Sequence, residues 1–333
     1  MGPALTRPCF CDACFGDMHV RHSARGYDRA RDIQNPGRAT RMTVPTPSAD
    51  FEPELVLLLC SDPADAVTRA LMQKRASLGW PLIALSAQQL IDGIELGTRW
   101  VVDGRRVDPD RTALINRLPL GDRLEPGPAT PDATVVRQAV WCRLRDELGR
   151  FRYVSSLPTA TSIMGCYGSL LDQWQDLPRL VPGLRVPEHS AASVPRALQG
   201  RVFAVNRWTP YSLGKPLDAT GQSEVPATQR VDYVMPEGGM VHLAQVGDAM
   251  FFPNAPPTMS ASQRQAMIDI ARAFAAVSAI RVLEHALFLG DGPPVLYSSF
   301  PVPVMSGGHP LYAQLVEQGL TNDIRKWAGR RAA

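Results

Sequence analysis

The sequence predicts an α/β protein, and two stretches carry most of that prediction. Residues 55–60 form a continuous apolar run of buried-strand type, followed by a helical pattern and a second apolar run at 81–85. This β-α-β order with a short connection predicts a parallel pair of strands. Near the other end, residues 281–309 contain two apolar strands around Asp291-Gly292, which is a strong hairpin signal.

Composition sets the class of protein. A chain of 333 residues is long enough for two domains, and 45% apolar with 20% charged residues is typical of a soluble globular protein. The net charge of +3 gives no argument for a nucleic-acid or membrane partner. The chain has neither an apolar run of membrane-spanning length nor a signal-peptide core, so we expect a cytoplasmic protein.

Residues 1–41 differ from the rest of the chain, because they are rich in Arg, Asp and Gly and lack a sustained apolar period. They contain three cysteines and two histidines, Cys9, Cys11, Cys14, His19 and His22. One interpretation is a zinc or iron–sulfur site, although the spacing fits no common zinc pattern. The interpretation that we favour is a disordered leader, which we place at 1–50.

The helix between the first two strands is expected to begin at Asp62, with Pro63 in its first turn and Gly79 after its end. A second hairpin is predicted around Asp103-Gly104, and a further strand at 112–115 ends in Asn116-Arg117. Later segments are assigned by periodicity and turn residues. They are a loop at 119–132, helices at 136–148, 169–175, 262–278 and 310–328, and strands at 153–157, 201–205, 229–234 and 240–246.

Two of these assignments are specific enough to test. The strands 229–234 and 240–246 flank Pro236-Glu-Gly-Gly239, and we expect them to form an antiparallel pair. Ser262 with Gln265 has the spacing of a capping box at the start of the longest helix.

Polar residues on the predicted C-terminal hairpin are the first candidates for a site. Glu284 could bind Mg²⁺, which takes one or two protein carboxylates when nucleotide phosphates supply other ligands. The alternative is a carboxylate with a structural role at a strand edge. Because neighbours on a strand alternate faces, His285 is expected to point away from Glu284 unless a β-bulge intervenes.

Cations that could bind phosphate form the second group. Lys215 is one of only three lysines and lies in a polar, glycine-containing loop, while Arg201 and Arg207 flank the preceding strand. The alternative for Lys215 is a solvated loop lysine, and no Walker A motif is present. Arg117 lies at the carboxyl end of a predicted strand, where an open α/β sheet binds ligands, so it is a candidate for an acidic substrate group.

The order of elements between residues 55 and 305 resembles the ATP-grasp family, in particular peptide-modifying ligases of the ribosomal-protein glutamate ligase type. The residues that carry the resemblance are TALINRLP with Arg117, PGLRVP at 182–187 and GDGPPVLYSSFPVP at 290–303. The resemblance implies a small N-terminal α/β domain at 51–130. It also implies an ATP-grasp-like domain at 131–333, with a central subdomain at 190–250 and a C-terminal subdomain at 251–333 enclosing a cleft.

The resemblance further implies ATP and Mg²⁺ as cofactors, and an ATP-dependent carboxylate–amine ligase that acts through an acyl-phosphate on a peptide or small molecule. Lys215, Arg207 and Arg201 would then contact phosphate, Arg117 the substrate and Glu284 the metal. The sequence departs from the family where Tyr297-Ser298-Ser299 replace E-x-N. The alternative is therefore a non-catalytic relative that binds a nucleotide, peptide or protein partner in the same cleft. The sequence is compatible with a homodimer and with a monomer.

Overall fold

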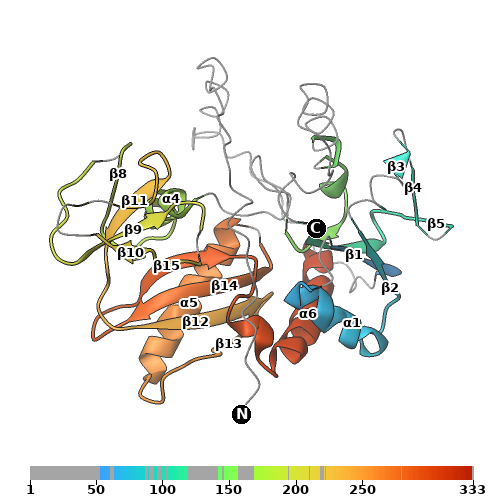
Figure 1. The fold of residues 1–333 in the computed structure, drawn as a ribbon. Helices are drawn as coiled ribbons and strands as arrows, with labels where there is room; N and C mark the ends of the chain where they lie inside the picture. Colours follow the sequence, from blue (N-terminus) through green and yellow to red (C-terminus); the bar gives the residue numbers. More distant parts are fainter. Residues whose placement is uncertain are drawn as a thin grey trace, which may run out of the picture. The chain divides into compact units, whose positions relative to one another are not determined.

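The computed structural model describes residues 53–60, 64–86, 89, 94–95, 99–102, 104–118, 142–144, 146–156, 169–193, 195–209, 211–217, 221, 223–278 and 280–331. These residues belong to one compact unit, Thr46–Ala333. Three predicted segments lie outside the described residues: the cysteine- and histidine-containing segment at 1–41, the loop at 119–132, and residues 136–141 of the helix predicted at 136–148. Residues 142–144 and 146–148 of that helix are helical. Figure 1 shows the elements coloured along the chain.

The N-terminal sheet is parallel, as its β-α-β pattern predicted. Its order is β2-β1-β6-β7, with β1 (Leu55–Cys60) in parallel pairing with both β2 (Leu82–Leu85) and β6 (Thr112–Arg117). The short β7 (Tyr153–Val154) pairs with β6. Every residue of β6 is buried. The β1 and β6 strands therefore form the centre of the sheet, with apolar layers on both faces.

The helix after β1 begins three residues later than predicted. Helix α1 (Ala66–Gln73) takes Asp65, not Asp62, as its N-cap, and the Asp65 carboxylate accepts a hydrogen bond from the Thr68 amide at 2.9 Å. The same Asp65 carboxylate receives Arg117 from the carboxyl end of β6. This tertiary ion pair, which the local sequence cannot show, explains why Asp65 serves as the cap.

The hairpin predicted around Asp103-Gly104 is present. Strand β4 (Arg99–Val102) pairs with β5 (Arg105–Arg106), and β3 (Ile94–Glu95) adds a third short strand. Gly104 has a positive φ of 73°, which glycine adopts without the strain of a Cβ. Trp100 and Val102 pack with the apolar layer on one face of the N-terminal sheet.

A small antiparallel sheet occupies the middle of the chain. Its order is β10-β9-β11-β8, formed by β8 (His189–Ala191), β9 (Val202–Asn206), β10 (Lys215–Pro216) and β11 (Arg230–Val234). Helix α4 (Leu170–Leu180) is longer than the predicted 169–175 and begins with a capping box between Ser169 and Asp172. Its Trp174 packs with Phe203 and Tyr233 of this sheet in one apolar cluster.

The C-terminal sheet contains the predicted hairpin. Its order is β13-β12-β14-β15, with β12 (Gly239–Val246), β13 (Ala249–Phe251), β14 (Val282–Leu289) and β15 (Val295–Phe300) all antiparallel. Helix α5 (Ala261–Ser278) covers one face of this sheet through Met267, Ala271 and Phe274, as the orange helix in Figure 1 shows. The capping box of α5 is formed by Ser260 and Gln263 and not by Ser262 and Gln265.

The predicted pairing of strands 229–234 and 240–246 is wrong, because these strands lie in different sheets. β11 pairs with β9 and β8, whereas β12 pairs with β14 and β13. Between them, Gly238 has a φ of 95°, and a Cβ on it would lie 2.1 Å from the Leu289 carbonyl oxygen. The chain therefore passes close to the end of β14 and continues into the next sheet instead of turning back.

Side chains of α4 complete the free edge of β15. The Gln173 amide accepts from the Ser299 N–H at 2.9 Å and donates to the Ser299 carbonyl at 3.0 Å, while Trp174 Nε1 donates to the Tyr297 carbonyl at 2.6 Å. Backbone groups at a sheet edge are costly to bury without partners. Helix α4 thus closes this edge as a neighbouring strand would.

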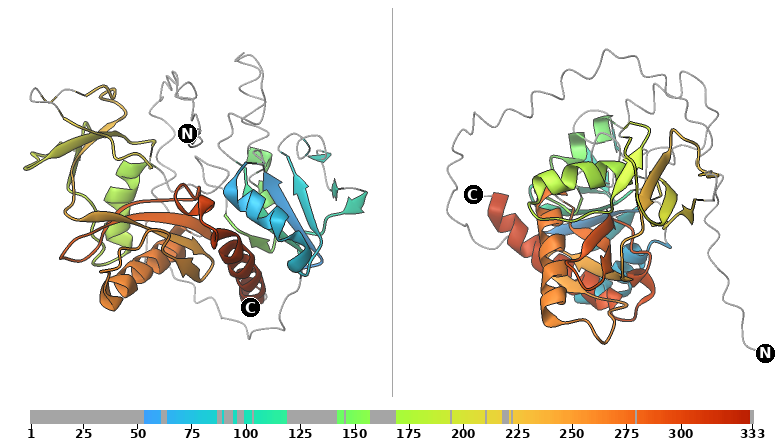
Figure 2. Two further views of the ribbon diagram at one scale, coloured as in Figure 1. Left: turned by 60° about the horizontal axis from the view of Figure 1, so that its bottom comes forward. Right: turned by 90° about the vertical axis from the view of Figure 1, so that its left-hand side faces the viewer.

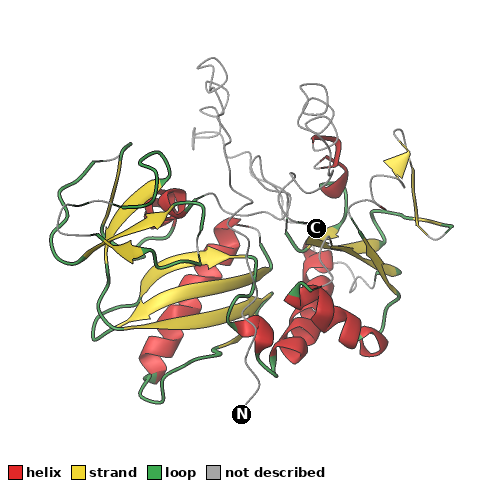
Figure 3. Ribbon diagram, in the orientation of Figure 1, coloured by secondary structure: helices red, strands yellow, loops and turns green. Residues whose placement is uncertain are grey.

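The last helix joins two sheets. Helix α6 (Tyr312–Arg331) packs through Val316, Leu320 and Ile324 into the cluster that holds α1 and one face of the parallel sheet, and Val246 of β12 belongs to the same cluster. Figure 2 shows α1 and α6 beside the parallel sheet. Figure 3 shows helices beside the parallel sheet and beside the C-terminal sheet. Among the described helices, none has the length and apolar character needed to span a membrane.

Candidate functional site

Glu284 of β14 lies at the centre of a cluster of hydrogen-bonding residues from β12 and the segment after β15. Its side chain is fully buried, and its carboxylate accepts hydrogen bonds from the Met305 N–H at 3.0 Å, the Ser306 N–H at 2.8 Å and the Ser306 hydroxyl at 2.5 Å. Both Ser306 bonds go to Oε2, whereas His242 Nδ1 on β12 lies 3.0 Å from Oε1, the oxygen that also accepts the 3.0 Å bond from Met305. Both oxygens therefore have protein partners, and those partners come mainly from the segment after β15.

The electrostatic state of Glu284 follows from these contacts. Burial alone would raise the pKa of its carboxyl group, but the hydrogen bonds from His242, Ser306 and Met305 outweigh burial and hold the pKa below its usual value. Glu284 is therefore ionised at neutral pH, and hydrogen bonds from protein donors stabilise its charge.

His285 points to the opposite face, as strand alternation predicted. Its ring nitrogens lie 2.7 Å from the Ser299 hydroxyl and 2.9 Å from Gln245 Oε1, and the ring contacts Phe274 of α5. Burial lowers the pKa of His285 to about 3, so the imidazole is neutral. The β-bulge in this hairpin falls after Ala286 and does not bring His285 to the side of Glu284.

The residues that share a face with Glu284 are poor ligands for Mg²⁺. Paired residues on antiparallel strands lie on the same face, so Phe300 and Ser298 of β15 accompany Glu284 and Ala286. A phenyl ring offers no ligand atom, and a serine hydroxyl is a weak one beside carboxylates. Among the described residues, no group of three His, Cys, Asp or Glu side chains is arranged to hold a metal ion. The β15 residues beside Glu284 therefore add no carboxylate for Mg²⁺.

Tyr297 makes a contact of a different kind. Its hydroxyl donates to the Ser212 carbonyl at 2.5 Å, and the ring packs among Trp174, Tyr233 and Phe288. The Tyr233 hydroxyl donates to the next carbonyl, that of Leu213, at 2.6 Å. At the position where the resemblance to ATP-grasp ligases implies E-x-N, this chain therefore uses an aromatic residue to bind the segment between β9 and β10.

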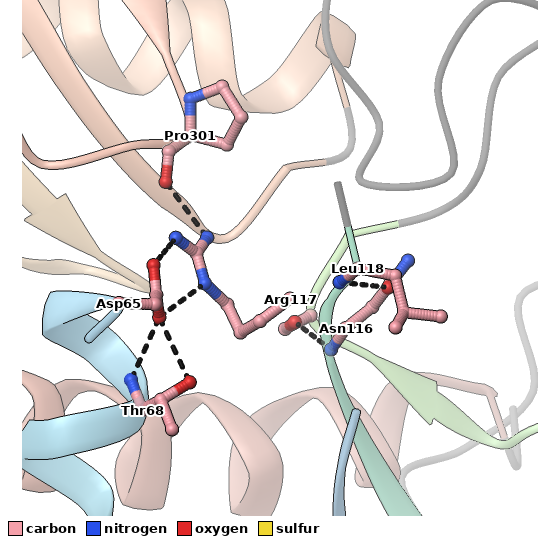
Figure 4. A network of polar contacts seen from close by, with 7 residues as sticks. Asp65, Thr68, Asn116, Arg117, Leu118 and Pro301 are labelled. Carbon is pink, nitrogen blue, oxygen red and sulfur yellow. Dashed lines mark hydrogen bonds and ion pairs between the residues drawn. The ribbon is translucent and has the colours of Figure 1, made fainter. Parts of the chain in front are cut away.

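Arg117 is buried at the carboxyl end of β6, where the sequence predicted it, but its guanidinium binds protein groups. Nε and Nη2 donate to the Asp65 carboxylate at 3.1 and 2.6 Å, and Nη1 donates to the Pro301 carbonyl at 2.8 Å (Figure 4). Burial alone would raise the pKa of Asp65, but Arg117 and Thr68 together hold the pKa below its usual value. The pair is thus ionised and connects β6, α1 and the segment after β15.

Of the three predicted phosphate cations, Lys215 lies on β10, and Arg201 and Arg207 lie immediately before and after β9. Lys215 is exposed on β10 and forms an ion pair with Glu224 at 2.6 Å, and the Arg201 guanidinium lies over the Phe203 ring at 5.0 Å. Arg207 stacks on Trp208 at 4.9 Å, and its Nη2 is 3.9 Å from Asp172. In the part of the chain that the structure describes, no hydrogen bond or ion pair joins any two of Arg117, Arg201, Arg207, Lys215 and Glu284.

Comparison with known proteins tests the predicted fold. The sequence matches no protein-family model and no curated protein sequence. Solved structures do match: the ATP-grasp ligase PsnB with a minimal precursor, Mg and ADP has a TM-score of 0.59 at 13% identity, over 84% of this chain and 100% of that one. The macrocyclase MdnC of Microcystis aeruginosa MRC, bound with the precursor peptide MdnA, has a TM-score of 0.57 at 11% identity, over 80% and 99%.

The chain has the ATP-grasp fold. The fold prediction is thereby confirmed, whereas the predicted domain bounds and the cleft between the subdomains at 190–250 and 251–333 stay predictions. The fold is one that ATP-dependent ligases have. The assignments of Lys215, Arg207, Arg201, Arg117 and Glu284 to phosphate, substrate and metal stay predictions.

Sequence reasoning did not identify several residues that build this region of the ATP-grasp fold. They are Asp65, Gln173, His242 and Ser306, each of which contacts a residue far along the chain. For Ser306 the only sequence signal is its position in Met305-Ser-Gly-Gly308, a turn-like run after a proline-rich segment. The others have no local signal, because their partners come from other elements.

Proposed function

We propose that this chain is a non-catalytic protein with the ATP-grasp fold that binds a peptide and does not transfer phosphate through the usual metal site. The observation that carries the proposal is the Glu284 carboxylate, whose two oxygens are engaged by His242, Met305 and Ser306. A carboxylate whose oxygens accept hydrogen bonds from the protein has little capacity left for Mg²⁺. The β15 residues beside Glu284 on the sheet do not supply another carboxylate.

The peptide part of the proposal is supported by the similar structures. PsnB is described with the precursor peptide PsnA2 and AMPPNP, and MdnC with the precursor peptide MdnA. A fold that accommodates a peptide in these proteins can keep that capacity after the metal ligands are lost, since function resides in sites and not in the fold itself.

A second candidate is an ATP-dependent carboxylate–amine ligase, and one observation favours it. Arg207 Nε is buried and has no hydrogen-bond partner among the described residues, so it could receive a phosphate oxygen. In such a ligase, ATP would transfer its γ-phosphoryl group to a carboxylate and leave as ADP. An amine would then displace phosphate from the acyl-phosphate to form the amide.

ADP release separates the two candidates. We expect purified protein incubated with ATP, Mg²⁺ and a mixture of short synthetic peptides rich in Asp and Glu to release no ADP above the level of a protein-free sample. The same mixture without Mg²⁺ is the control for contaminating activity. Mg²⁺-dependent ADP release that Arg207→Gln lowers while Asp269→Ala, an exposed change on α5, leaves it intact would refute the proposal and favour the ligase.

A further inference from the structure

Two segments with exposed apolar side chains are held from beneath by buried polar groups. The first connects β9 to β10. Its Ser212 and Leu213 carbonyls accept from the hydroxyls of Tyr297 and Tyr233, which belong to different sheets. Gly214 has a φ of 68°, and a Cβ there would lie 2.0 Å from the Ala204 carbonyl oxygen, so the segment also rests directly on β9.

The second segment follows β15 and is held at both ends. Arg117 donates to the Pro301 carbonyl, and Glu284 accepts from the backbone of Met305 and Ser306. Gly307 lies so close to α1 that a Cβ would be 2.7 Å from the Ala66 Cβ. Two residues expected to bind substrate and metal thus fix the conformation of this segment.

The exposed residues of the two segments are large and apolar. The Tyr211 ring contacts the Phe300 ring at a centroid distance of 6.4 Å, so the first segment meets the second where the second leaves β15. Along the second segment, Pro301, Pro303 and Ser306 are buried while the residues between them are exposed. We call the exposed set the apolar strip: Trp208 (43% exposed), Tyr211 (49%), Leu213 (37%), Val302 (38%), Val304 (46%) and Met305 (50%).

The two segments that carry these residues are in contact at Tyr211 and Phe300. Exposed apolar residues on adjoining segments mark interaction surfaces, whereas single ones need no explanation. Fixed loops also lose little conformational entropy on binding, and Trp and Tyr are common anchors at interfaces. The buried hydroxyls, guanidinium and carboxylate beneath the strip therefore give it the rigidity that a binding surface needs.

Charge at the end of the strip indicates the chemistry of its partner. The Arg207 guanidinium lies over Trp208, its nearest described carboxylate is 3.9 Å away, and its Nε donor has no partner among the described residues. A carboxylate from a partner could take up this donor in a charge-assisted hydrogen bond.

We infer that the apolar strip is the docking surface for a peptide segment that packs apolar side chains on Trp208, Tyr211 and Met305 and presents a carboxylate to Arg207. This inference rests on the proposed function, since it names the surface and the class of peptide. An extended peptide with alternating apolar and acidic residues meets both requirements.

Selection from a library of short random peptides displayed on phage tests the inference with the full chain. We expect the selected peptides to be rich in apolar and acidic residues. The double change Trp208→Ser with Tyr211→Ser is expected to weaken their binding by at least about tenfold, and Arg207→Gln by about tenfold. Leu180→Ser and Val277→Ser, which remove apolar side chains 53% and 40% exposed on α4 and α5, should leave binding unchanged.

Three outcomes would overturn the inference. They are a selection that yields no binding peptide, peptides that bind the strip variants as tightly as the wild-type chain, and strip variants that change only the oligomeric state. In the second case the chain would still be a peptide-binding protein, so the proposed function would stand. Mg²⁺-dependent ADP release would refute the proposed function without touching the strip. The changed apolar side chains are exposed, and the half-buried Arg207 has only one ion pair among the described residues, at 3.9 Å, so the thermal midpoint of each variant should match the wild type, and this is measured first.

Discussion

Replacing Glu284 with alanine is expected to destabilise the fold by about 3–5 kcal/mol, the cost of breaking a buried ionic group that is fully hydrogen-bonded. The change leaves the Met305 and Ser306 N–H groups, the Ser306 hydroxyl and His242 without their acceptor. Chemical denaturation followed by circular dichroism measures the loss directly. An ordinary metal ligand at the same position would give a much smaller loss, because removing a ligand from an empty metal site relieves repulsion or changes little.

The matched control is Asp269→Ala on α5, which removes an exposed carboxylate. This variant should change the free energy of unfolding by no more than about 0.5 kcal/mol. If Glu284→Ala is as stable as the control, Glu284 does not hold the segment after β15, and the structural basis of the proposed function is lost.

Arg117→Leu is expected to produce the second large effect, again about 3–5 kcal/mol at neutral pH, because it leaves the Asp65 carboxylate buried without its cation. The pKa of Asp65 is lowered in the folded protein, so the stability from this pair is present above the usual value of 3.8 and is lost as the pH falls below it. The difference between wild type and variant should therefore be largest at neutral pH and shrink below about pH 4.

Urea denaturation across that pH range provides the measurement. Arg117→Leu combined with Asp65→Leu removes both charges and should recover part of the stability at neutral pH, because an apolar pair can replace a buried ion pair. A difference that stays constant with pH would contradict the role given to Asp65. A double variant less stable than Arg117→Leu would do the same.

Local pattern was sufficient for much of the fold. The parallel β1, β2 and β6 strands, the hairpin of β14 and β15 and the opposite orientation of Glu284 and His285 all follow from apolar runs, Asp-Gly turns and the two-residue period of a strand. These features depend on residues close together in the sequence, which is why the sequence alone indicates them.

The features that could not be predicted depend on distant partners. The pairing of β11 with β9 and of β12 with β14 is decided where Gly238 meets Leu289, and Asp65 became the cap of α1 because Arg117 reaches it across the sheet. Glu284 and Arg117 were singled out as metal and substrate candidates, and those roles stay predictions. The bonds that they form to Pro301, Met305 and Ser306 come from a proline-rich segment whose path no periodicity describes.

The central claim is that the Glu284 region binds protein groups in place of a metal–nucleotide complex. Thermal unfolding of the wild-type chain with millimolar ATP, in the presence of Mg²⁺ and in the presence of EDTA, tests this claim most directly, because a ligand that binds the folded state raises the midpoint. The account predicts the same midpoint in both conditions. A midpoint that rises with ATP only when Mg²⁺ is present would contradict it.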